Sequence, residues 1–384
     1  MIAKYSIFVP EMKGDLSEEW RQCLKQIIYN HEKGFRLIKL NVFTDQPDYE
    51  SYIKTWKEIA KSIRNAFGKQ CPAFNITVHP PEKPWKIVVE AAYADADSSD
   101  ITTKVWNAIP YVVCTSDSGK EVWAGGLGFG LFYSDTRGAA GAAFDQMKAI
   151  LDAEGMSFNH LVRQWNYIGN ILEIKKGFQN YQVFNEVRSE VYQKYRTIHG
   201  YPAATGIGMN LDGVSLDFCA LMAKEGITIK PIENPNQVNA YEYGQEVLKG
   251  LVGKGNSIKH PPQFERALLL AGKMRSTIFI SGTASIIGQD IIGIEDIEKQ
   301  TVVTIDNINK LTDQERIGKM IANTGKEWGK FILLRVYVKN QLDFARVKSI
   351  CSQRFPEVPA IFIQSDICRE KLLVELEAEF LINN

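Results

Sequence analysis

The chain has 384 residues, of which 45% are hydrophobic and 23% charged, and its 45 basic and 45 acidic side chains give a formal net charge of zero. This composition is typical of a globular protein with two or three domains, because one hydrophobic core seldom serves a chain of this length. A neutral chain lacks the basic excess typical of proteins that bind nucleic acids or membranes, so we expect neither partner.

Targeting and cofactor motifs are not found in the sequence. It has no apolar run long enough to span a membrane and no N-terminal signal-peptide pattern, so we expect a cytoplasmic protein. Six scattered cysteines without a CxxC pair predict reduced thiols, and five histidines without ligand spacing predict no metal site. The glycine-rich stretch 124–130 lacks the lysine of a phosphate-binding loop, and we expect no organic cofactor.

The first third of the chain alternates helical and extended patterns. Apolar residues at helical spacing predict one helix around residues 20–28 and a second around residues 52–67. Extended patterns predict strands over residues 37–43, 71–78 and 85–93.

The middle and last thirds repeat this order of elements. Strands are predicted over residues 106–113, 121–126, 161–168, 202–209, 214–222, 266–271, 276–281, 331–338, 359–364 and 372–382. Helices are predicted over residues 140–151, 180–196, 297–311 and 344–351. The repetition predicts three copies of one ββαβαββ unit, of which the first lacks part of its opening hairpin.

Two sets of residues recur in the three copies and align them. They are Lys39, Arg163 and Arg335, and the Pro-Ala dipeptides at 72–73, 202–203 and 359–360. Each copy is an α+β layer whose helices cover one sheet face, so three copies can bury their other faces on one another. We therefore expect a monomer with pseudo-threefold symmetry and clefts between units 1–95, 100–225 and 240–384. The Gly/Pro/Lys-rich segment 223–262 is predicted to include a mobile loop over a cleft.

The last predicted strand carries Glu375, Glu377 and Glu379 on one face, because alternate residues of a strand point the same way. Glutamate is a weak strand former, so three on one face need a reason. Either that face is exposed to water, or one carboxyl group lies at an interface and does chemistry. The spacing alone leaves both interpretations open.

All three copies resemble the YjgF/RidA-like (bacillus chorismate mutase-like) fold, and the chain more narrowly resembles the chorismatases, which are built on that fold. The resemblance is carried by Arg163-Gln164-Trp165-Asn166-Tyr167, the Tyr181…Phe184…Arg188 spacing, Pro202-Ala203-Ala204-Thr205-Gly206, Glu233-Asn234-Pro235, Ser281-Gly282-Thr283-Ala284 and Asp366-Ile367-Cys368-Arg369 with Val374-Glu375. It implies an enzyme that cleaves the enolpyruvyl ether of chorismate, releasing pyruvate with 3-hydroxybenzoate or a dihydroxycyclohexadiene carboxylate.

The resemblance also implies roles for two residues. Glu375 falls on the general acid of the family, which protonates the enol-ether methylene carbon. A carboxyl group can donate that proton at neutral pH only if an apolar or crowded site raises its pKa. Cys368 falls where a cysteine goes with the 3-hydroxybenzoate-forming subtype and an alanine with the hydrolytic subtype.

A dicarboxylate substrate needs cations, N–H donors and apolar ring contacts. The candidate substrate-binding residues are Arg163, Arg188, Arg335, Arg369, Thr205, Gly206, Ser281, Gly282, Thr283, Tyr201 and Tyr241, with Trp165 as a further ring contact. The chain departs from the family at 236–244, where Asn236, Asn239, Glu242 and Gly244 stand in a region that usually carries basic residues. We expect Lys249 or Arg266 to substitute there, or the substrate to differ.

Two other functions compete with a chorismatase. Imine deaminases of this fold need an arginine just after the Pro-Ala dipeptide, and Phe74, Ala204 and Ile361 stand at those positions, which disfavours this activity. A non-catalytic binder of aromatic or keto acids stays open. On their closing strands the first copy has Glu90 and the second has Asp217 or Phe218, depending on a one-residue choice of alignment. At most one or two of the three clefts can therefore hold a carboxylic acid.

Overall fold

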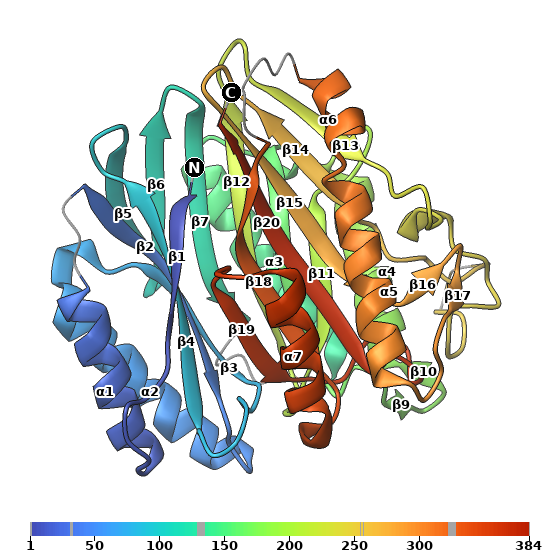
Figure 1. Cartoon of the computed structure of the whole chain (residues 1–384), viewed down its shortest axis with the longest axis horizontal. Helices are drawn as coiled ribbons and strands as arrows, with labels where there is room; N and C mark the ends of the chain where they lie inside the picture. Colours follow the sequence, from blue (N-terminus) through green and yellow to red (C-terminus); the bar gives the residue numbers. More distant parts are fainter. Residues whose placement is uncertain are drawn as a thin grey trace.

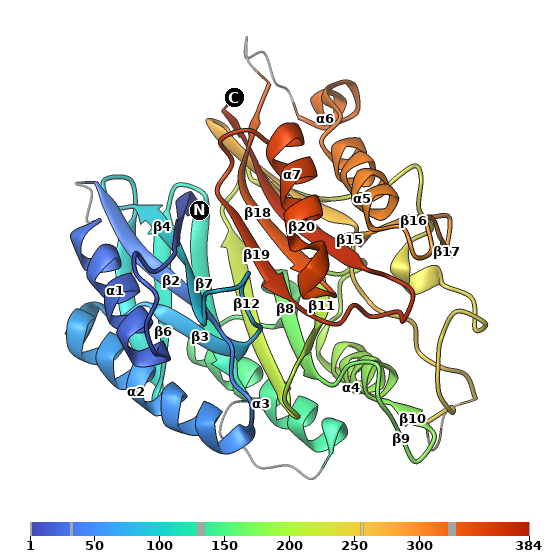
Figure 2. The ribbon, with the colours of Figure 1, turned by 60° about the horizontal axis from the view of Figure 1, so that its bottom comes forward.

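The structure is a computed structural model of the chain that describes residues 2–30, 34–128, 135–253, 255, 257–321 and 328–383. It contains three main β-sheets whose helices lie on the outside of the molecule (Figure 1, Figure 2). The predicted α+β class is therefore confirmed. Among the described residues, no helix is long and apolar enough to cross a membrane. Residues 129 and 130 of the glycine-rich stretch lie outside the described part.

The first sheet has the strand order β1-β4-β2-β3, in which only β2 and β3 are parallel. Its elements are β1 (Ile2–Phe8), α1 (Leu16–Tyr29), β2 (Phe35–Thr44), α2 (Tyr49–Phe67), the 3-10 helix η1 (Gly68–Gln70), β3 (Ala73–Val78) and β4 (Ile87–Asp95). Helix α1 begins with a capping box, because Asp15 and Glu18 each accept a hydrogen bond from the other's backbone N–H. Trp20, Cys23 and Ile27 of this helix are buried, whereas Ile28, which the predicted apolar stripe included, is 47% exposed.

The second sheet has the order β5-β6-β7-β12-β8-β11. Its strands are β5 (Asp100–Trp106), β6 (Ile109–Ser116), β7 (Gly119–Leu127), β8 (Leu161–Gly169), β11 (Ala203–Met209) and β12 (Val214–Ala223). Its helices are α3 (Thr136–Ala153), η2 (Phe158–His160) and α4 (Asn180–Tyr195), and a small hairpin of β9 (Ile174–Lys175) and β10 (Phe178–Gln179) precedes α4.

The third sheet has the equivalent order β13-β14-β15-β20-β18-β19. Its strands are β13 (Thr228–Ile232), β14 (Ala267–Ala271), β15 (Arg275–Ala284), β18 (Lys330–Val338), β19 (Ala360–Gln364) and β20 (Val374–Asn383). Its other elements are η3 (Ala240–Glu242), the hairpin β16 (Ile286–Ile287) and β17 (Asp290–Ile291), α5 (Ile297–Leu311), α6 (Gln314–Met320), η4 (Gln341–Asp343) and α7 (Phe344–Arg354).

The repeated order of elements is confirmed, because the four strands of the first sheet match the last four of each larger sheet. The first copy opens with β1 alone, so the expected loss of part of its opening hairpin is confirmed. The prediction of two opening strands per copy was wrong, since the second and third copies open with three. Strands β5 and β13 were not predicted, because they are exposed sheet edges without a buried face to impose alternation.

One predicted equivalence is wrong by two residues. Strands β2, β8 and β18 share a β-bulge against their closing strands, and the first residues beyond it are Lys39, Arg163 and Leu333. Arg335 is therefore equivalent to Asn41 and Trp165. By the same register, the closing-strand carboxylates Glu90, Asp217 and Glu377 are equivalent, and Glu375 corresponds to Val88 and Ser215.

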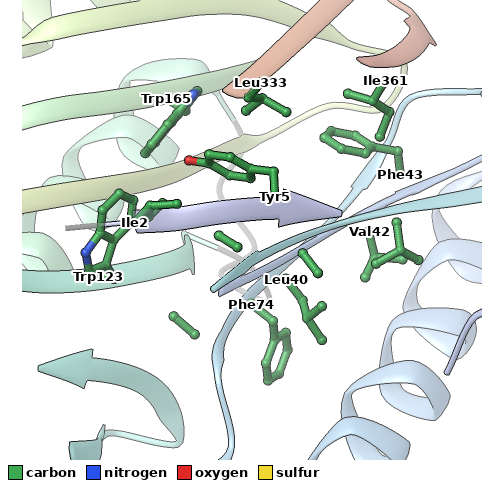
Figure 3. Packing of buried hydrophobic residues seen from close by; sticks show 14 of the residues in the cluster. Ile2, Tyr5, Leu40, Val42, Phe43, Phe74, Trp123, Trp165, Leu333 and Ile361 are labelled. Carbon is green, nitrogen blue, oxygen red and sulfur yellow. The ribbon is translucent and has the colours of Figure 1, made fainter. Parts of the chain in front are cut away.

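The inner faces of the three sheets meet in one buried cluster at the centre of the molecule. Figure 3 shows Ile2 and Tyr5 of β1 beside Trp123 and Trp165 of the second sheet, with Leu333 of the third sheet close by. The Trp123 and Trp165 ring centroids are 6.4 Å apart. Each sheet therefore buries one face under its helices and the other against its neighbours.

Candidate active site

A cavity of about 970 Å³ lies between the second and third sheets. One wall comes from Ala204 and Gly206 of β11, and the facing wall from Gly282 of β15 and Glu375 of β20. The two sheets are joined at this point, since the Ser281 hydroxyl accepts a hydrogen bond from the Ala204 N–H at 2.9 Å. The predicted cleft between neighbouring copies is therefore present at this interface.

The segment between the two sheets completes the cavity. Tyr243, Leu248, Phe264 and Arg266, all from the segment before β14, line its wall. The 3-10 helix η3 lies just before Tyr243. Tyr243 and Leu248 of the predicted segment 223–262 thus border the cleft, and the mobility of that segment stays a prediction.

The three glutamates of β20 face the interior, because Glu375, Glu377 and Glu379 are 4%, 2% and 3% exposed. The structure thus excludes the water-exposed interpretation of this strand face. Their surroundings differ. Glu375 borders the cavity, Glu377 is held by two arginines, and the Tyr5 hydroxyl donates to Glu379 at 2.5 Å.

The Glu375 carboxyl group makes no hydrogen bond or ion pair with any other described residue. Burial raises its pKa to about 8, the negative charge of Glu377 adds to the rise, and Arg266 and Arg163 oppose it. At neutral pH this carboxyl group is therefore mostly protonated. A protonated acid beside an open cavity can deliver a proton to a bound molecule.

Gly282 is required by the position of Glu375. A Cβ atom at residue 282 would overlap Oε1 of Glu375, and it would also lie 3.1 Å from Cγ2 of Thr205. Glycine therefore leaves the space that the carboxyl group occupies. On the facing strand, a Cβ atom at Gly206 would lie 3.2 Å from the Tyr181 ring.

Cys368 lines the same cavity, on the loop before β20. Burial, and then the charge of Glu375, raise the pKa of its thiol to about 12, whereas Arg369 and Arg266 oppose the rise. Cys368 is therefore a neutral thiol at neutral pH. A neutral thiol is a poor nucleophile, so it contributes shape and polarity to the cavity wall.

Two arginines in the cavity wall flank the ring of Tyr243. Arg266 Nη2 donates to the Tyr243 hydroxyl at 2.7 Å, and the Arg369 guanidinium lies 4.6 Å from the ring centroid. Arg369 Nη1 also donates to the Gln289 carbonyl at 2.7 Å, while its Nη2 has no partner. In the described part of the chain neither arginine pairs with a carboxylate, so both charges are available to an anionic ligand.

Arg188 is buried on α4 and donates to Asn185 at 2.7 Å. It does not border the cavity, although Tyr181 and Gln182 of the same helix do. Its Nε atom has no partner, and no carboxylate among the described residues neutralises its charge. An uncompensated buried cation next to a cavity wall favours an anion nearby.

The other predicted arginines lie away from the cavity. Arg163 Nη2 bonds Glu377 at 2.9 Å, and Arg335 bonds both Glu377 and Glu90. Thr205, also predicted to bind substrate, donates to Glu377 instead. These groups form a buried ionic network between the three sheets.

The remaining predicted residues do not border the cavity. Tyr201 and Tyr241 contact each other, with ring centroids 5.3 Å apart, and Tyr241 bonds Glu265. The Ser281 and Thr283 hydroxyls donate to backbone carbonyls at 2.6 and 2.8 Å. Trp165 donates to Glu377 at 2.8 Å, so it too belongs to the ionic network.

The structure adds residues that the sequence prediction left out. Tyr243, Gln289, Lys339 and Lys371 border the cavity, and so do Lys249 and Arg266, the two cations expected to substitute. The departing residues Asn236, Asn239, Glu242 and Gly244 do not border it. No periodic pattern marks Tyr243 or Gln289, because both lie in irregular segments. Among the described residues, no His, Cys, Asp or Glu cluster could hold a metal ion.

Known proteins resemble this chain in sequence and in structure. A family described as "Chorismatase FkbO/Hyg5-like, N-terminal" matches residues 129–221. A 3-hydroxybenzoate synthase of Streptomyces hygroscopicus is 30% identical over 246 residues, which cover 62% of this chain and 68% of the relative. A chorismatase of Streptomyces rapamycinicus is 31% identical over 228 residues, covering 58% of this chain and 64% of the relative.

The crystal structure of a chorismatase aligns over 99% of both chains, with a TM-score of 0.64 and 20% sequence identity. At this identity the match establishes a shared fold. It extends the likeness to the first sheet, which the family match at 129–221 does not include.

Proposed function

This chain belongs to the chorismatase family, and from that premise we propose that it cleaves the enolpyruvyl ether of chorismate to pyruvate and 3-hydroxybenzoate. The hydrolytic route, in which water is consumed and a dihydroxycyclohexadiene carboxylate is formed, is the alternative. Both routes begin with protonation of the enol-ether methylene carbon. They differ in whether a ring hydroxyl or water captures the resulting oxocarbenium ion.

The observation that carries this proposal is the buried, unpartnered Glu375 carboxyl group at a cavity with uncompensated arginines. Its proton would go to the methylene carbon, and the resulting carboxylate would stabilise the cationic intermediate. Burial between two sheets keeps the acid protonated at neutral pH. Glu375 is therefore assigned as the general acid.

The cavity suits a dicarboxylate. Arg266 and Arg369 flank Tyr243 without carboxylate partners among the described residues, and planar guanidinium groups bind carboxylates through two parallel hydrogen bonds. Arg188 adds a buried positive charge behind the wall formed by α4. We propose that Arg266 and Arg369 bind the substrate carboxylates, whereas Arg163 and Arg335 bind the buried glutamates of the ionic network.

Cys368 supports 3-hydroxybenzoate as the aromatic product. Its neutral thiol occupies the cavity wall, and the resemblance to the chorismatases implies that a cysteine at this position goes with the 3-hydroxybenzoate-forming type. It would shape the site around the ring and leave the proton transfer to Glu375.

We further propose that units 1–95, 100–225 and 240–384 form a pseudo-trimer of YjgF/RidA-like units in a monomeric, cytoplasmic chain. The shared strand order of the sheets supports this arrangement. The cavity is built from the second and third sheets of one chain, so the site does not require a second copy.

Incubation with chorismate, followed by detection of pyruvate with lactate dehydrogenase and of the aromatic product by chromatography, tests the function. The protein should form pyruvate and 3-hydroxybenzoate in equal amounts, and Glu375→Gln should bind the product but lose turnover. A Glu375→Gln variant with full activity would overturn the assignment of the acid. Ligand-induced thermal stabilisation without any pyruvate would instead support a binding protein.

A further inference from the structure

We propose that Glu377 and Thr205 are positioning residues for Glu375, holding a fixed negative charge beside the acid and fixing Gly282 against it. Neither residue borders the cavity, so neither would touch the substrate. The inference deepens the proposed function, on which its kinetic test rests. It concerns how the buried network between the sheets acts on the proton donor.

Glu377 is held as a carboxylate by donors from three strands. Arg163 Nη2 and Trp165 Nε1, both from β8, donate at 2.9 and 2.8 Å. Arg335 of β18 and Thr205 of β11 complete the set. Burial alone raises the pKa of Glu377, but the arginines and these hydrogen bonds outweigh burial and lower it. Its negative charge is therefore permanent at working pH.

Thr205 connects this carboxylate to the wall of the cavity. Its hydroxyl oxygen donates to Glu377 and accepts from Arg163 Nη2 at 2.8 Å and from the Gly282 N–H at 3.0 Å. Gly282 in turn lies against Oε1 of Glu375. The Thr205 hydroxyl therefore connects β11 of the second sheet, the Glu377 carboxylate and the Gly282 backbone that contacts Glu375.

The charge of Glu377 acts on Glu375 at short range. The two residues share one face of β20, so their Cα atoms are about 7 Å apart. The other titratable groups that act on Glu375 are Arg266 before β14, Arg163 of β8, Cys368 of the preceding loop and Tyr181 of α4. Among them Glu377 supplies the negative charge that favours the protonated acid.

The first test compares the pH dependence of kcat in the wild-type protein and in Glu377→Gln. Loss of the fixed charge should make Glu375 release its proton at lower pH. The alkaline limb of the kcat profile should therefore shift to lower pH by about one to two pH units. The wild-type to variant ratio of kcat should therefore grow between pH 6 and pH 9. An unmoved limb would overturn the proposal.

A matched control separates this effect from general damage. Glu19 is a buried carboxylate of α1 that bonds the Lys86 N–H at 2.8 Å, in the first sheet and away from the cavity. Glu19→Gln should lower the melting temperature without moving the alkaline limb. If it moves the limb as far as Glu377→Gln does, the positioning role is wrong.

The second test uses the conservative pair Thr205→Val and Thr205→Ser. Valine keeps the shape but removes the hydroxyl, so the Gly282 N–H loses its acceptor and Oε2 of Glu377 keeps only its bond from Arg163. Thr205→Val should reduce kcat at least tenfold with a much smaller change in KM, and serine should restore the wild-type pH profile. Equal kinetics in both variants would overturn the role of the hydroxyl.

A readout without substrate keeps the inference separate from the proposed activity. Infrared difference spectra of the carboxyl band, assigned with Glu375→Gln, report the protonation of Glu375 directly. Its titration should move to lower pH in Glu377→Gln. If no pyruvate forms but the titration moves, the proposed reaction fails and the inference stands. If it does not move, the inference fails whatever the reaction.

Discussion

Gly282 of β15 lies so close to Glu375 of β20 that a Cβ atom at residue 282 would overlap Oε1 of the carboxyl group. The two residues come from neighbouring antiparallel strands whose register shifts between Ile280 and Thr283. The β-bulge there places Gly282 beside the acid. A glycine in the neighbouring strand β15 therefore leaves the space that the Glu375 carboxyl group occupies.

Gly282→Ala should reduce kcat by about 100-fold, because the added methyl group would displace the carboxyl group, and a shift of about 1 Å can cost that much. Steady-state kinetics with chorismate measure the change. Gly141→Ala is the control, since Gly141 lies in α3 and a Cβ atom added there would meet no other residue within 4 Å. It should keep full activity. A fully active Gly282→Ala variant would contradict the geometry described for this pair.

Cys368→Ala should shift the products from 3-hydroxybenzoate towards the dihydroxycyclohexadiene carboxylate, while pyruvate formation continues. The smaller side chain leaves room for water beside the ring, and the thiol is neutral, so no nucleophile is lost. Chromatography of the products gives the ratio. Cys351→Ala, a buried thiol of α7, should leave the ratio unchanged. If pyruvate formation stops in Cys368→Ala, the shape role is wrong.

Arg369→Gln should raise KM for chorismate by about 10- to 100-fold with a smaller effect on kcat, since a hydrogen bond to a charged group contributes about 1.5–3 kcal/mol. The guanidinium lies over Tyr243 and Nη1 bonds the Gln289 carbonyl, so its loss removes one ring contact and one hydrogen bond from the folded protein. Arg346→Gln on the exposed face of α7 is the control. An unchanged KM would remove Arg369 from the substrate site.

The sequence predicted the elements whose side chains alternate regularly. The helix with Trp20 follows a helical period because one side of it packs on the protein, and the strand with Glu375 alternates between a buried apolar face and a buried acidic face. It did not predict β13, whose residues are mostly exposed and lack that constraint. The alignment of Arg335 with Lys39 failed because Arg335 lies two residues further beyond the shared β-bulge than Lys39 does, and a bulge leaves no signal in apolar periodicity.

The site was predictable only where a family motif marked it. Glu375 and Cys368 fall on such motifs and both border the cavity. Arg163 and Arg335 were predicted as substrate ligands because cations on strands look alike in sequence, whether they meet a ligand or a buried carboxylate. Tyr243 could not be predicted, since its place between two arginines depends on the path of an irregular segment.

Arg335→Met should destabilise the protein by about 3–5 kcal/mol, because it leaves Glu90 and Glu377 buried without their shared cation. Urea unfolding measures the loss as a lower midpoint at an unchanged slope. Lys319→Met is the comparison, because Lys319 and its partner Glu315 are both exposed at the surface of α6. It should cost at most about 1 kcal/mol. Equal losses in the two variants would contradict the burial of the network.

The stability of the protein should fall as the pH rises from 5 to 9, and Glu379 is one source. Burial raises the pKa of Glu379 to about 8, and the Tyr5 hydrogen bond opposes the rise. In the unfolded chain this glutamate has an ordinary pKa, so the folded state holds more protons in the interval between the two values. Its contribution is fully present below the unfolded pKa and is lost as the pH passes through the folded one.

Glu379→Gln keeps a neutral side chain at every pH, so it should flatten this decline and raise the melting temperature at pH 9 relative to the wild type. Differential scanning calorimetry at pH 5, 7 and 9 gives both slopes. Glu375→Gln should act in the same direction, because burial raises that pKa too. Asp152→Asn, on the exposed surface of α3, should leave the slope unchanged. A wild-type melting temperature that rises towards pH 9 would mean that Glu379 is folded as a carboxylate, contrary to its buried position beside Tyr5.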